Sequence, residues 1–189
     1  MLTDKTIQQF TDHIASQSTA MAGATIAAAA AVACGLGEAC LRINAPLAAA
    51  AAERAQAERR AGRLAAIRGR LLALTDEDGA AITAFAALRA AGKTLQGQER
   101  LCQMPIEMAR LANEAACLLQ EFRPFIQLAQ DDLEMAIVLL AGTAAAATLL
   151  LDSNLRLWPD PPLLVRFEPE LAALRAAAGR VQPVERIRP

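Results

Sequence analysis

The sequence has no tyrosine, a single tryptophan and only 3% aromatic residues, although 54% of its 189 residues are hydrophobic. Alanine makes up the difference, in runs such as 27–31 and 48–52. Alanine is the best helix former, whereas strands favour aromatic and β-branched residues. The shortage therefore excludes a β-sandwich or a barrel and predicts an all-α protein of the size of one ordinary domain.

An excess of one charge is also missing, because 19 basic residues face 20 acidic ones for a net charge of −1. This balance excludes a strongly basic nucleic-acid domain and an acidic tail.

The cysteines have no C-x-x-C spacing and only one histidine accompanies them, so we expect no metal site. They fit small buried residues in a reducing compartment. The N-terminus lacks the apolar core of a signal peptide, which favours a cytoplasmic protein. The four cysteines are Cys34, Cys40, Cys102 and Cys117.

Two apolar stretches, 20–36 and 133–151, need a separate test against a membrane span. The second has the length of a span, about 20 residues. However, it contains Glu134 and Gly142, acidic residues flank both of its ends, and no lysine or arginine asymmetry orients it. A helix that is apolar all round is equally typical of the centre of a bundle. We interpret both stretches as buried core and as a candidate subunit interface, with no membrane involved.

Start and stop signals divide the chain into six or seven helices, which we expect to form one antiparallel bundle with a long apolar helix at its centre. Thr75 is expected to be an N-cap, with the acids 76–78 in the first turn of a new helix. Residues 1–160 are expected to form the bundle, and 161–189 a proline-containing extension with a short helix. The expected helices lie at 3–16, 26–42, 46–74, 75–92, 98–122, 130–157 and 168–179.

Several short motifs follow one another in a fixed order along residues 2–160. They are T-A-M-A-G-A-T-I-A-A at 19–28, D-G-A-A-I at 78–82, G-K at 92–93, M-P-I-E-M-A at 104–109, D-D-L-E-M-A at 131–136 and S-N-L at 153–155. This order resembles the cyclodeaminase/cyclohydrolase family, which includes formiminotetrahydrofolate cyclodeaminase and bacterial methenyltetrahydrofolate cyclohydrolases. In that family the first motif reads P-x-P-G-G-G-S and runs into an alanine-rich helix.

The resemblance implies an enzyme of folate one-carbon metabolism, a cyclohydrolase (hydrolase) or a cyclodeaminase (lyase), that acts on the one-carbon unit at N5 and N10 of tetrahydrofolate. It implies a folate as the substrate, no metal or redox cofactor, and a homodimer or larger homo-oligomer with sites between subunits. By the same resemblance the catalytic candidates are Asp78 and Asp132, and the substrate-binding candidates are Gly23, Thr25, Lys93 and Asn154.

The residues by themselves leave other interpretations open. Asp78 and Asp132 also fit acids in the first turn of a helix, where the helix dipole stabilises them and keeps them ionised. Gly23 also fits a tight helix start, and Lys93 a helix C-terminus. Asp132 and Asn154 are twenty-two positions apart, or about 33 Å along one helix, so a pocket that uses both would need two copies.

One buried-looking charge and several departures from the family pattern bear on function. Glu38 is the only charge between His13 and Arg42, and fits either an i,i+4 pair with Arg42 or a pocket carboxylate.

Of the three family glycines only Gly23 is present, and both prolines are absent. We therefore keep a second hypothesis, a catalytically degenerate bundle that serves as a binding or assembly module, and a third, an unrelated small-molecule binder. A homo-oligomer is expected in the first two cases, because so much alanine-rich helix must be covered.

Overall fold

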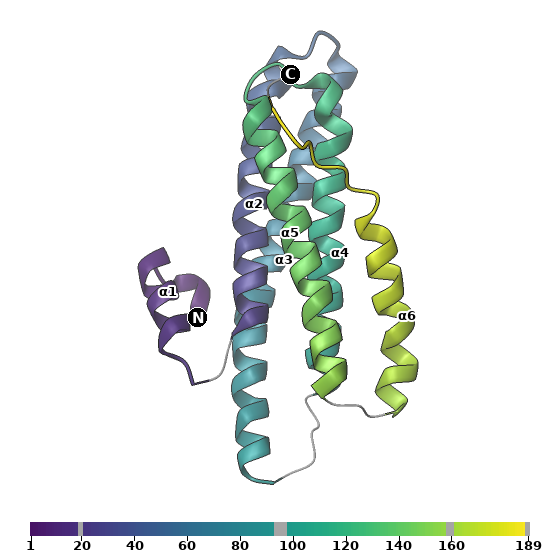
Figure 1. Cartoon of the computed structure of the whole chain (residues 1–189). Coiled ribbons are helices and arrows are strands. Elements are labelled where there is room, and N and C mark those ends of the chain that lie inside the picture. Colours follow the sequence, from purple (N-terminus) through teal and green to yellow (C-terminus); the bar gives the residue numbers. More distant parts are fainter. Residues whose placement is uncertain (19–20, 93–97, 158–160, 188–189) are drawn as a thin grey trace.

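The computed structural model describes residues 1–18, 21–92, 98–157 and 161–187. Within these ranges it contains six α-helices, three short 3-10 helices and no strand, which confirms the all-α bundle (Figure 1). The α-helices are α1 (Ile7–Ser16), α2 (Ala22–Asn44), α3 (Ala51–Ala90), α4 (Gln98–Phe122), α5 (Gln130–Leu157) and α6 (Pro161–Ala178). The 3-10 helices are η1 (Leu2–Asp4), η2 (Ala45–Leu47) and η3 (Arg123–Phe125).

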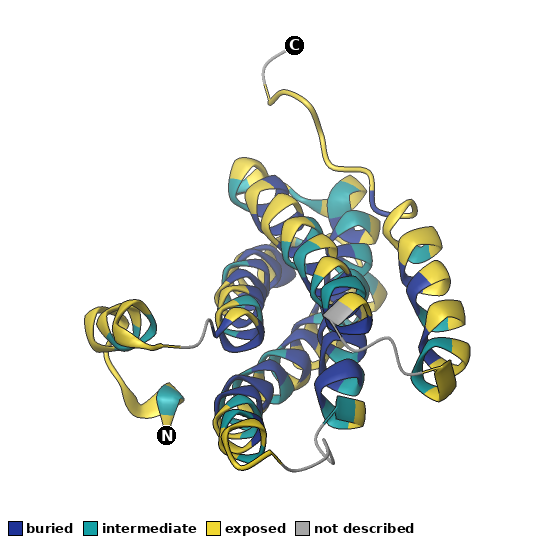
Figure 2. Ribbon diagram, turned by 60° about the horizontal axis from the view of Figure 1, so that its bottom comes forward, coloured by how far each residue is buried: buried dark blue, intermediate teal, exposed yellow. Residues whose placement is uncertain are grey.

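Four long helices, α2 to α5, form an antiparallel bundle in which neighbours in the chain are also neighbours in space. The packing is most extensive between α2 and α3 and between α4 and α5, and the α2–α5 and α3–α4 contacts close the ring. Helix α6 packs alongside α4 and α5 and leaves another side of α5 open (Figure 2). Helix α1 stands apart from the bundle and buries none of its residues. One face of the bundle, formed by α2 and α5, is therefore left uncovered by another helix.

The core is built from small residues on α2 and larger ones on the helices around it. Ala24, Ala27, Ala30 and Ala33 are fully buried, and Gly37 is buried with them. A methyl group on Gly37 would lie 2.5 Å from Leu119 Cδ1, so the leucine of α4 fills the space that the missing side chain leaves. Close packing of this kind explains how a chain poor in aromatic residues still forms a dense interior.

The expected helices 98–122 and 130–157 agree with the structure, whereas the expected break at Thr75 is wrong. Helix α3 continues without interruption from Ala51 to Ala90. Thr75 is in its interior, where its Oγ1 donates to the Leu71 carbonyl at 3.0 Å instead of capping a new helix. Pro46, expected in the first turn of the same helix, lies in η2, so α3 begins at Ala51.

The acids that follow Thr75 bind other segments rather than the start of their own helix. Asp76 accepts hydrogen bonds from Thr3 N at 3.2 Å and from Thr3 Oγ1 at 2.6 Å. Glu77 pairs with Arg70 and Arg100. Asp78 accepts from the amide of Ala24 on α2. A run of acids that resembles a helix N-terminus is therefore explained by three separate tertiary contacts.

The last helix is longer than expected, because α6 begins at Pro161 and not at residue 168. Pro161 suits a first helical position, since its missing N–H would be unpaired there in any case. Pro169 is inside α6, which ends just before Gly179. The remainder of the expected break, residues 158–160, lies outside the described residues.

Two helical segments, Ala22–Leu47 and Gln130–Arg156, are long and apolar enough to cross a membrane by length and composition alone. Core helices of globular bundles pass the same test. Helix α5 contacts α2, α4 and α6 with its inner side, but its outer side is apolar and open. Met135, Val138 and Leu149 are 52%, 46% and 67% exposed, so only half of this stretch is core.

Candidate functional site

The start of α2 and the middle of α3 meet through Gly23 and Asp78. Asp78 is 6% exposed, and its Oδ2 accepts a hydrogen bond of 2.8 Å from the backbone N–H of Ala24. A methyl group on Gly23 would lie 2.1 Å from Asp78 Oδ1, which no real contact allows. Glycine at position 23 is thus required for this carboxylate to reach the first turn of α2, where it accepts from the N–H of Ala24, which has no partner four residues back in its own helix.

The N-terminal segment of the chain packs against α3 on either side of Asp78, at Asp76 and Gly79. Leu2 and Met21 pack over Gly79, where an added methyl group would lie 2.6 Å from Leu2 Cδ1 and 3.1 Å from Met21 Cε. The hydrogen bonds between Asp76 and Thr3 hold η1 in this position. Apolar side chains therefore pack against α3 at Gly79, the residue next to Asp78.

Burial determines the protonation behaviour of Asp78. Removal from water raises the pKa of its carboxyl group above the ordinary 3.8, and the hydrogen bond from Ala24 N opposes this shift only in part. The expectation that the helix dipole of α3 holds Asp78 ionised is wrong, because Asp78 is in the interior of α3 and not in a first turn. A carboxyl group with a raised pKa can both accept and donate a proton nearer neutral pH.

The other predicted site residues are not gathered around this pair. Thr25 follows in the second turn of α2, but its Oγ1 donates to the Met21 carbonyl at 2.9 Å within the same helix. Asn154 is buried near the end of α5, and its Nδ2 donates to the Leu101 carbonyl of α4 at 2.7 Å. Lys93 lies outside the described residues.

Asp132 is far from Asp78 within one chain. It is in the first turn of α5, as expected, and is near enough to Cys40 that its charge helps to raise the pKa of that thiol. Cys40 and Gly23 are seventeen residues apart on α2, which corresponds to about 25 Å. The structure therefore brings Gly23 and Asp78 together and leaves Asp132 and Asn154 at other places.

Glu38 is a structural ion-pair residue rather than a free pocket carboxylate. It is buried, and its two oxygens accept from Arg42 at 2.5 Å and from Arg68 at 3.2 Å. The i,i+4 partner was expected from the spacing. The second partner, on α3, was not, because pairs between helices leave no local pattern in a sequence.

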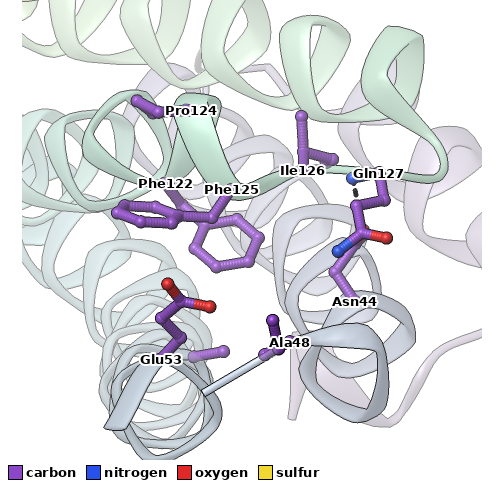
Figure 3. A pocket seen from close by; sticks show the side chains of 10 residues that line it. Asn44, Ala48, Glu53, Phe122, Pro124, Phe125, Ile126 and Gln127 are labelled. Atoms are coloured by element: carbon purple, nitrogen blue, oxygen red, sulfur yellow. Dashed lines mark hydrogen bonds between the residues drawn. The ribbon is translucent and has the colours of Figure 1, made fainter.

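A separate cavity of about 220 Å³ opens at the end of the bundle that carries η2 and η3 (Figure 3). The rings of Phe122 and Phe125 face it, with centroids 6.0 Å apart, and the Glu53 carboxylate points into it. Asn44 borders the cavity but uses its amide elsewhere: Oδ1 accepts from the amides of Gln127 and Leu128, at 2.7 and 3.0 Å. None of the predicted site residues that the structure describes lines this cavity.

Within the described part of the chain, no three His, Cys, Asp or Glu side chains are grouped so that they could hold a metal ion. The contact that sequence reasoning missed is the one between η1 and α3. Its only signal was Asp76, which was interpreted as part of a helix start. Leu2 and Thr3 carry no motif by which their contacts with Gly79 and Asp76 could be recognised.

Comparisons with known proteins agree with this architecture. The model of the family described as Formiminotransferase-cyclodeaminase matches residues 6–172. Among solved structures, the chain is similar to the crystal structure of a formiminotetrahydrofolate cyclodeaminase from Thermotoga maritima. The TM-score is 0.81 and the sequence identity 19%, over 96% of this chain and 93% of that chain. At this identity the likeness shows a shared fold. No curated protein matches the sequence.

Proposed function

The chain belongs to the formiminotransferase-cyclodeaminase family, and from this premise we propose that it is a folate one-carbon enzyme. Its substrate would be a tetrahydrofolate that carries a one-carbon unit at N5 and N10. The observation that carries the proposal is the buried Asp78 carboxyl group, which reaches the first turn of α2 across Gly23. A buried acid with a raised pKa at the first turn of a helix is suited to proton transfer on a polar substrate edge.

In the cyclohydrolase reaction, water adds to the methenyl carbon between N5 and N10. The bond from that carbon to one nitrogen then breaks as this nitrogen takes up a proton, which leaves a formyl group on the other nitrogen. Asp78 in its ionised form would take the proton that the attacking water loses. In the cyclodeaminase reaction, N10 attacks the formimino carbon and loses its proton, and the bond from that carbon to the former imino nitrogen breaks to release ammonia. Asp78 would take the proton from N10 and pass it to the departing nitrogen, which receives its second proton from solvent. Both are proton transfers at a single carboxyl group, and neither calls for a metal or redox cofactor.

In this proposal the remaining predicted residues position Asp78 or bind the substrate. Gly23 leaves the space that lets Asp78 reach the start of α2. Thr25 and Lys93 would bind polar groups of the folate. Asp132 of one copy of the chain would act together with Asn154 of a second copy. Their separation along α5 supports an assembly of at least two copies. The same proposal places the enzyme in the cytoplasm, where folates are used.

A second function, a catalytically degenerate bundle that binds a partner or assembles, is favoured by one observation. The only hydrogen bond to the Asp78 carboxylate from the described residues comes from Ala24 N, so the acid itself occupies part of the first turn of α2. A folate edge would have to compete with Asp78 for those N–H groups. In that case Asp78 would be an internal cap for α2 and not a catalytic residue.

The deciding experiment follows the near-ultraviolet absorbance of 5,10-methenyltetrahydrofolate with purified protein. We expect protein-dependent loss of absorbance above buffer hydrolysis. Asp78→Asn should lower the rate at least about a hundredfold, in the range of general acid–base catalysis. Asp152→Asn serves as the matched control, because Asp152 lies on the surface and pairs with Arg175.

Formimino-tetrahydrofolate, followed through ammonia release, separates the two reactions. Turnover of one substrate alone assigns the activity. If the protein accelerates neither reaction and calorimetry detects no folate binding, the enzyme proposal is wrong and the degenerate bundle is supported. If Asp78→Asn keeps full turnover, the activity is present but Asp78 does not carry it.

A further inference from the structure

The cavity of about 220 Å³ at the η2–η3 end of the bundle has no role in the proposed function. Asn44 borders it at one end of α2, whereas Gly23 is near the other end of the same helix, about 30 Å away along its axis. Pockets for drug-sized ligands measure about 300–1,000 Å³, so this cavity suits a smaller molecule. The side chains that line it determine the chemistry of that molecule.

Aromatic rings are concentrated at this cavity. The chain has only five phenylalanines and no tyrosine, yet two of the five phenylalanines line it. The rings of Phe122 and Phe125 have their centroids 6.0 Å apart and their planes inclined by 36°. They form one aromatic wall of the cavity, and Phe125 is 39% exposed (Figure 3).

The Glu53 carboxylate faces this aromatic wall from the first turn of α3 (Figure 3). Glu53 is the only charged residue among the described residues that line the cavity. Its one hydrogen bond comes from the backbone N–H of Ala50 at 3.4 Å, which is longer than the usual range of about 2.7–3.2 Å. No base from the described part of the chain therefore neutralises this carboxylate inside the cavity.

A carboxylate opposite aromatic rings is an arrangement that attracts organic cations. The face of an aromatic ring carries partial negative charge and attracts a cation within about 6 Å of its centroid. The carboxylate supplies a full negative charge from the other side. Ala48, Ala49 and Ala57 line part of the remaining surface, and their methyl groups suit contact with alkyl groups.

The polar groups at the border of the cavity limit which cation fits. Asn44 already uses its whole amide, because its Oδ1 accepts from the amides of Gln127 and Leu128. Its Nδ2 donates to the Cys40 and Leu128 carbonyls. A calcium or magnesium ion needs about six oxygen ligands, and an ammonium group with several N–H donors needs several acceptors. One carboxylate and two rings instead suit a cation whose nitrogen carries alkyl groups.

We propose that this cavity binds a small quaternary ammonium compound of the choline type. The methylated nitrogen lies between the Glu53 carboxylate and the aromatic wall of Phe122 and Phe125. The compound is held by charge and by apolar contact, with no covalent step. This proposal goes beyond the proposed function and does not rest on it, since it uses neither Asp78 nor a folate.

Calorimetric titration of the full chain with choline chloride tests the site, with the ionic strength held constant by sodium chloride. We expect saturable binding of one choline per chain with a Kd of about 1 mM, as suits a ligand of few atoms. The alcohol in which carbon replaces the choline nitrogen has the same shape without the charge. It should bind at least about tenfold more weakly, because neither the carboxylate nor the rings attract it electrostatically.

Glu53→Gln should weaken choline binding about tenfold and leave binding of the neutral alcohol unchanged. A glutamine can still accept from Ala50 N, so the start of α3 is kept. Glu58→Gln is the matched control, because it removes the same charge from an exposed position of α3 that does not line the cavity. Far-ultraviolet circular dichroism must show the same helix content in both variants.

Phe125→Leu should weaken choline binding about three- to tenfold, because leucine keeps an apolar contact but lacks the partial charge of the ring face. Phe125 suits this test better than Phe122, which is only 4% exposed and belongs to the core. The nuclear magnetic resonance signal of the choline methyl protons should move upfield on binding, because these protons would lie over the ring faces. In Phe125→Leu this shift should shrink.

Three results would overturn the proposal. The first is the absence of saturable choline binding at concentrations up to a hundred times the expected Kd. The second is a neutral alcohol that binds as tightly as choline, or equal affinities for choline in Glu53→Gln and Glu58→Gln, since the positive charge would then not be recognised at Glu53. The third is full binding with an unchanged methyl shift in Phe125→Leu, which would place choline somewhere other than this cavity.

Discussion

The Asp78 carboxylate lies against the backbone of Gly23, so close that a methyl group on Gly23 would be 2.1 Å from Asp78 Oδ1. Two residues that are fifty-five positions apart in the chain thus form one structural unit, the start of α2 with an acid from α3. The stability of this unit and the protonation of its acid can be measured independently of any substrate.

Gly23→Ala should destabilise the protein by about 1–3 kcal/mol in urea unfolding, because the new methyl group forces Asp78 or α2 to move. Gly62→Ala is the matched control. Gly62 is exposed inside α3 and has open space around it, so alanine there should stabilise by up to about 1 kcal/mol. Equal effects of the two substitutions would show that Gly23 is not in tight contact with Asp78.

Because of Asp78, the free energy of unfolding of the protein should fall as pH rises. Burial raises the pKa of its carboxyl group in the folded state, so the folded protein keeps this proton to a higher pH than the unfolded chain does. The resulting stability is complete below the ordinary pKa of 3.8 and is lost as pH rises through the raised value. Asp78→Asn has no such proton.

As pH rises from 4 to 7, the free energy of unfolding of the original protein should therefore fall relative to that of Asp78→Asn. Urea titrations at several pH values measure it. A difference that stays constant with pH would mean that the pKa of Asp78 is the same in the folded and unfolded states.

Arg123→Ala should cost about 3–5 kcal/mol, because it leaves the buried Glu134 without its partner. The pair has two hydrogen bonds, at 2.5 and 2.7 Å, and Glu134 is 2% exposed. Arg175→Ala, which breaks a surface pair with Asp152, should cost less than about 1 kcal/mol. Arg123→Ala should also speed proteolysis after residue 180, since Arg123 holds the Gln182 carbonyl.

Asn44→Asp should destabilise the cavity end of the bundle by about 2–4 kcal/mol. The Asn44 Nδ2 group donates to the carbonyls of Cys40 and Leu128, both at 2.9 Å, and an aspartate has no hydrogen for either. Amide hydrogen exchange should accelerate at Gln127 and Leu128 before it does in α4. Uniform acceleration along the whole chain would instead indicate global unfolding.

Cys117 should be the first thiol to react with a maleimide or a disulfide reagent. Burial raises the pKa of Cys34 to about 12 and those of Cys40 and Cys102 to about 11, so their thiolates are scarce at pH 8. Cys117 is only half-buried. Mass spectrometry of partly labelled protein decides the order, and rapid labelling of Cys34 would show that the α2–α3 contact opens readily.

The fold could be predicted from the sequence because its signals are local. Arg123 and Pro124 end α4, and Gln130 to Asp132 begin α5, as their residue types indicate. Thr75 to Asp78 gave an equally clear local signal for a helix start, and it was misleading. Each of those acids has its partner in another segment, at Thr3, Arg100 or Ala24, and a single sequence does not record such pairings.

The candidate site was predictable only in part for the same reason. Gly23 and Asp78 were both selected through the family resemblance, but their direct contact was not expected. The cover that Leu2 and Met21 form over Gly79 depends on where the N-terminal segment folds back. Asp132 and Asn154 were selected by motif alone, and in one chain they face different surroundings.

The pairing of helices in the bundle also bears on how the chain folds. The two largest helix contacts, α2 with α3 and α4 with α5, each join segments that follow one another in sequence, so each helical hairpin can form early and locally. We therefore expect the docking of the two halves, along the seams that α2 shares with α5 and α3 with α4, to limit the folding rate. A chain cut between residues 92 and 98 should accordingly reassemble from its two fragments, and a substitution on either seam should slow that reassembly more than one inside a hairpin.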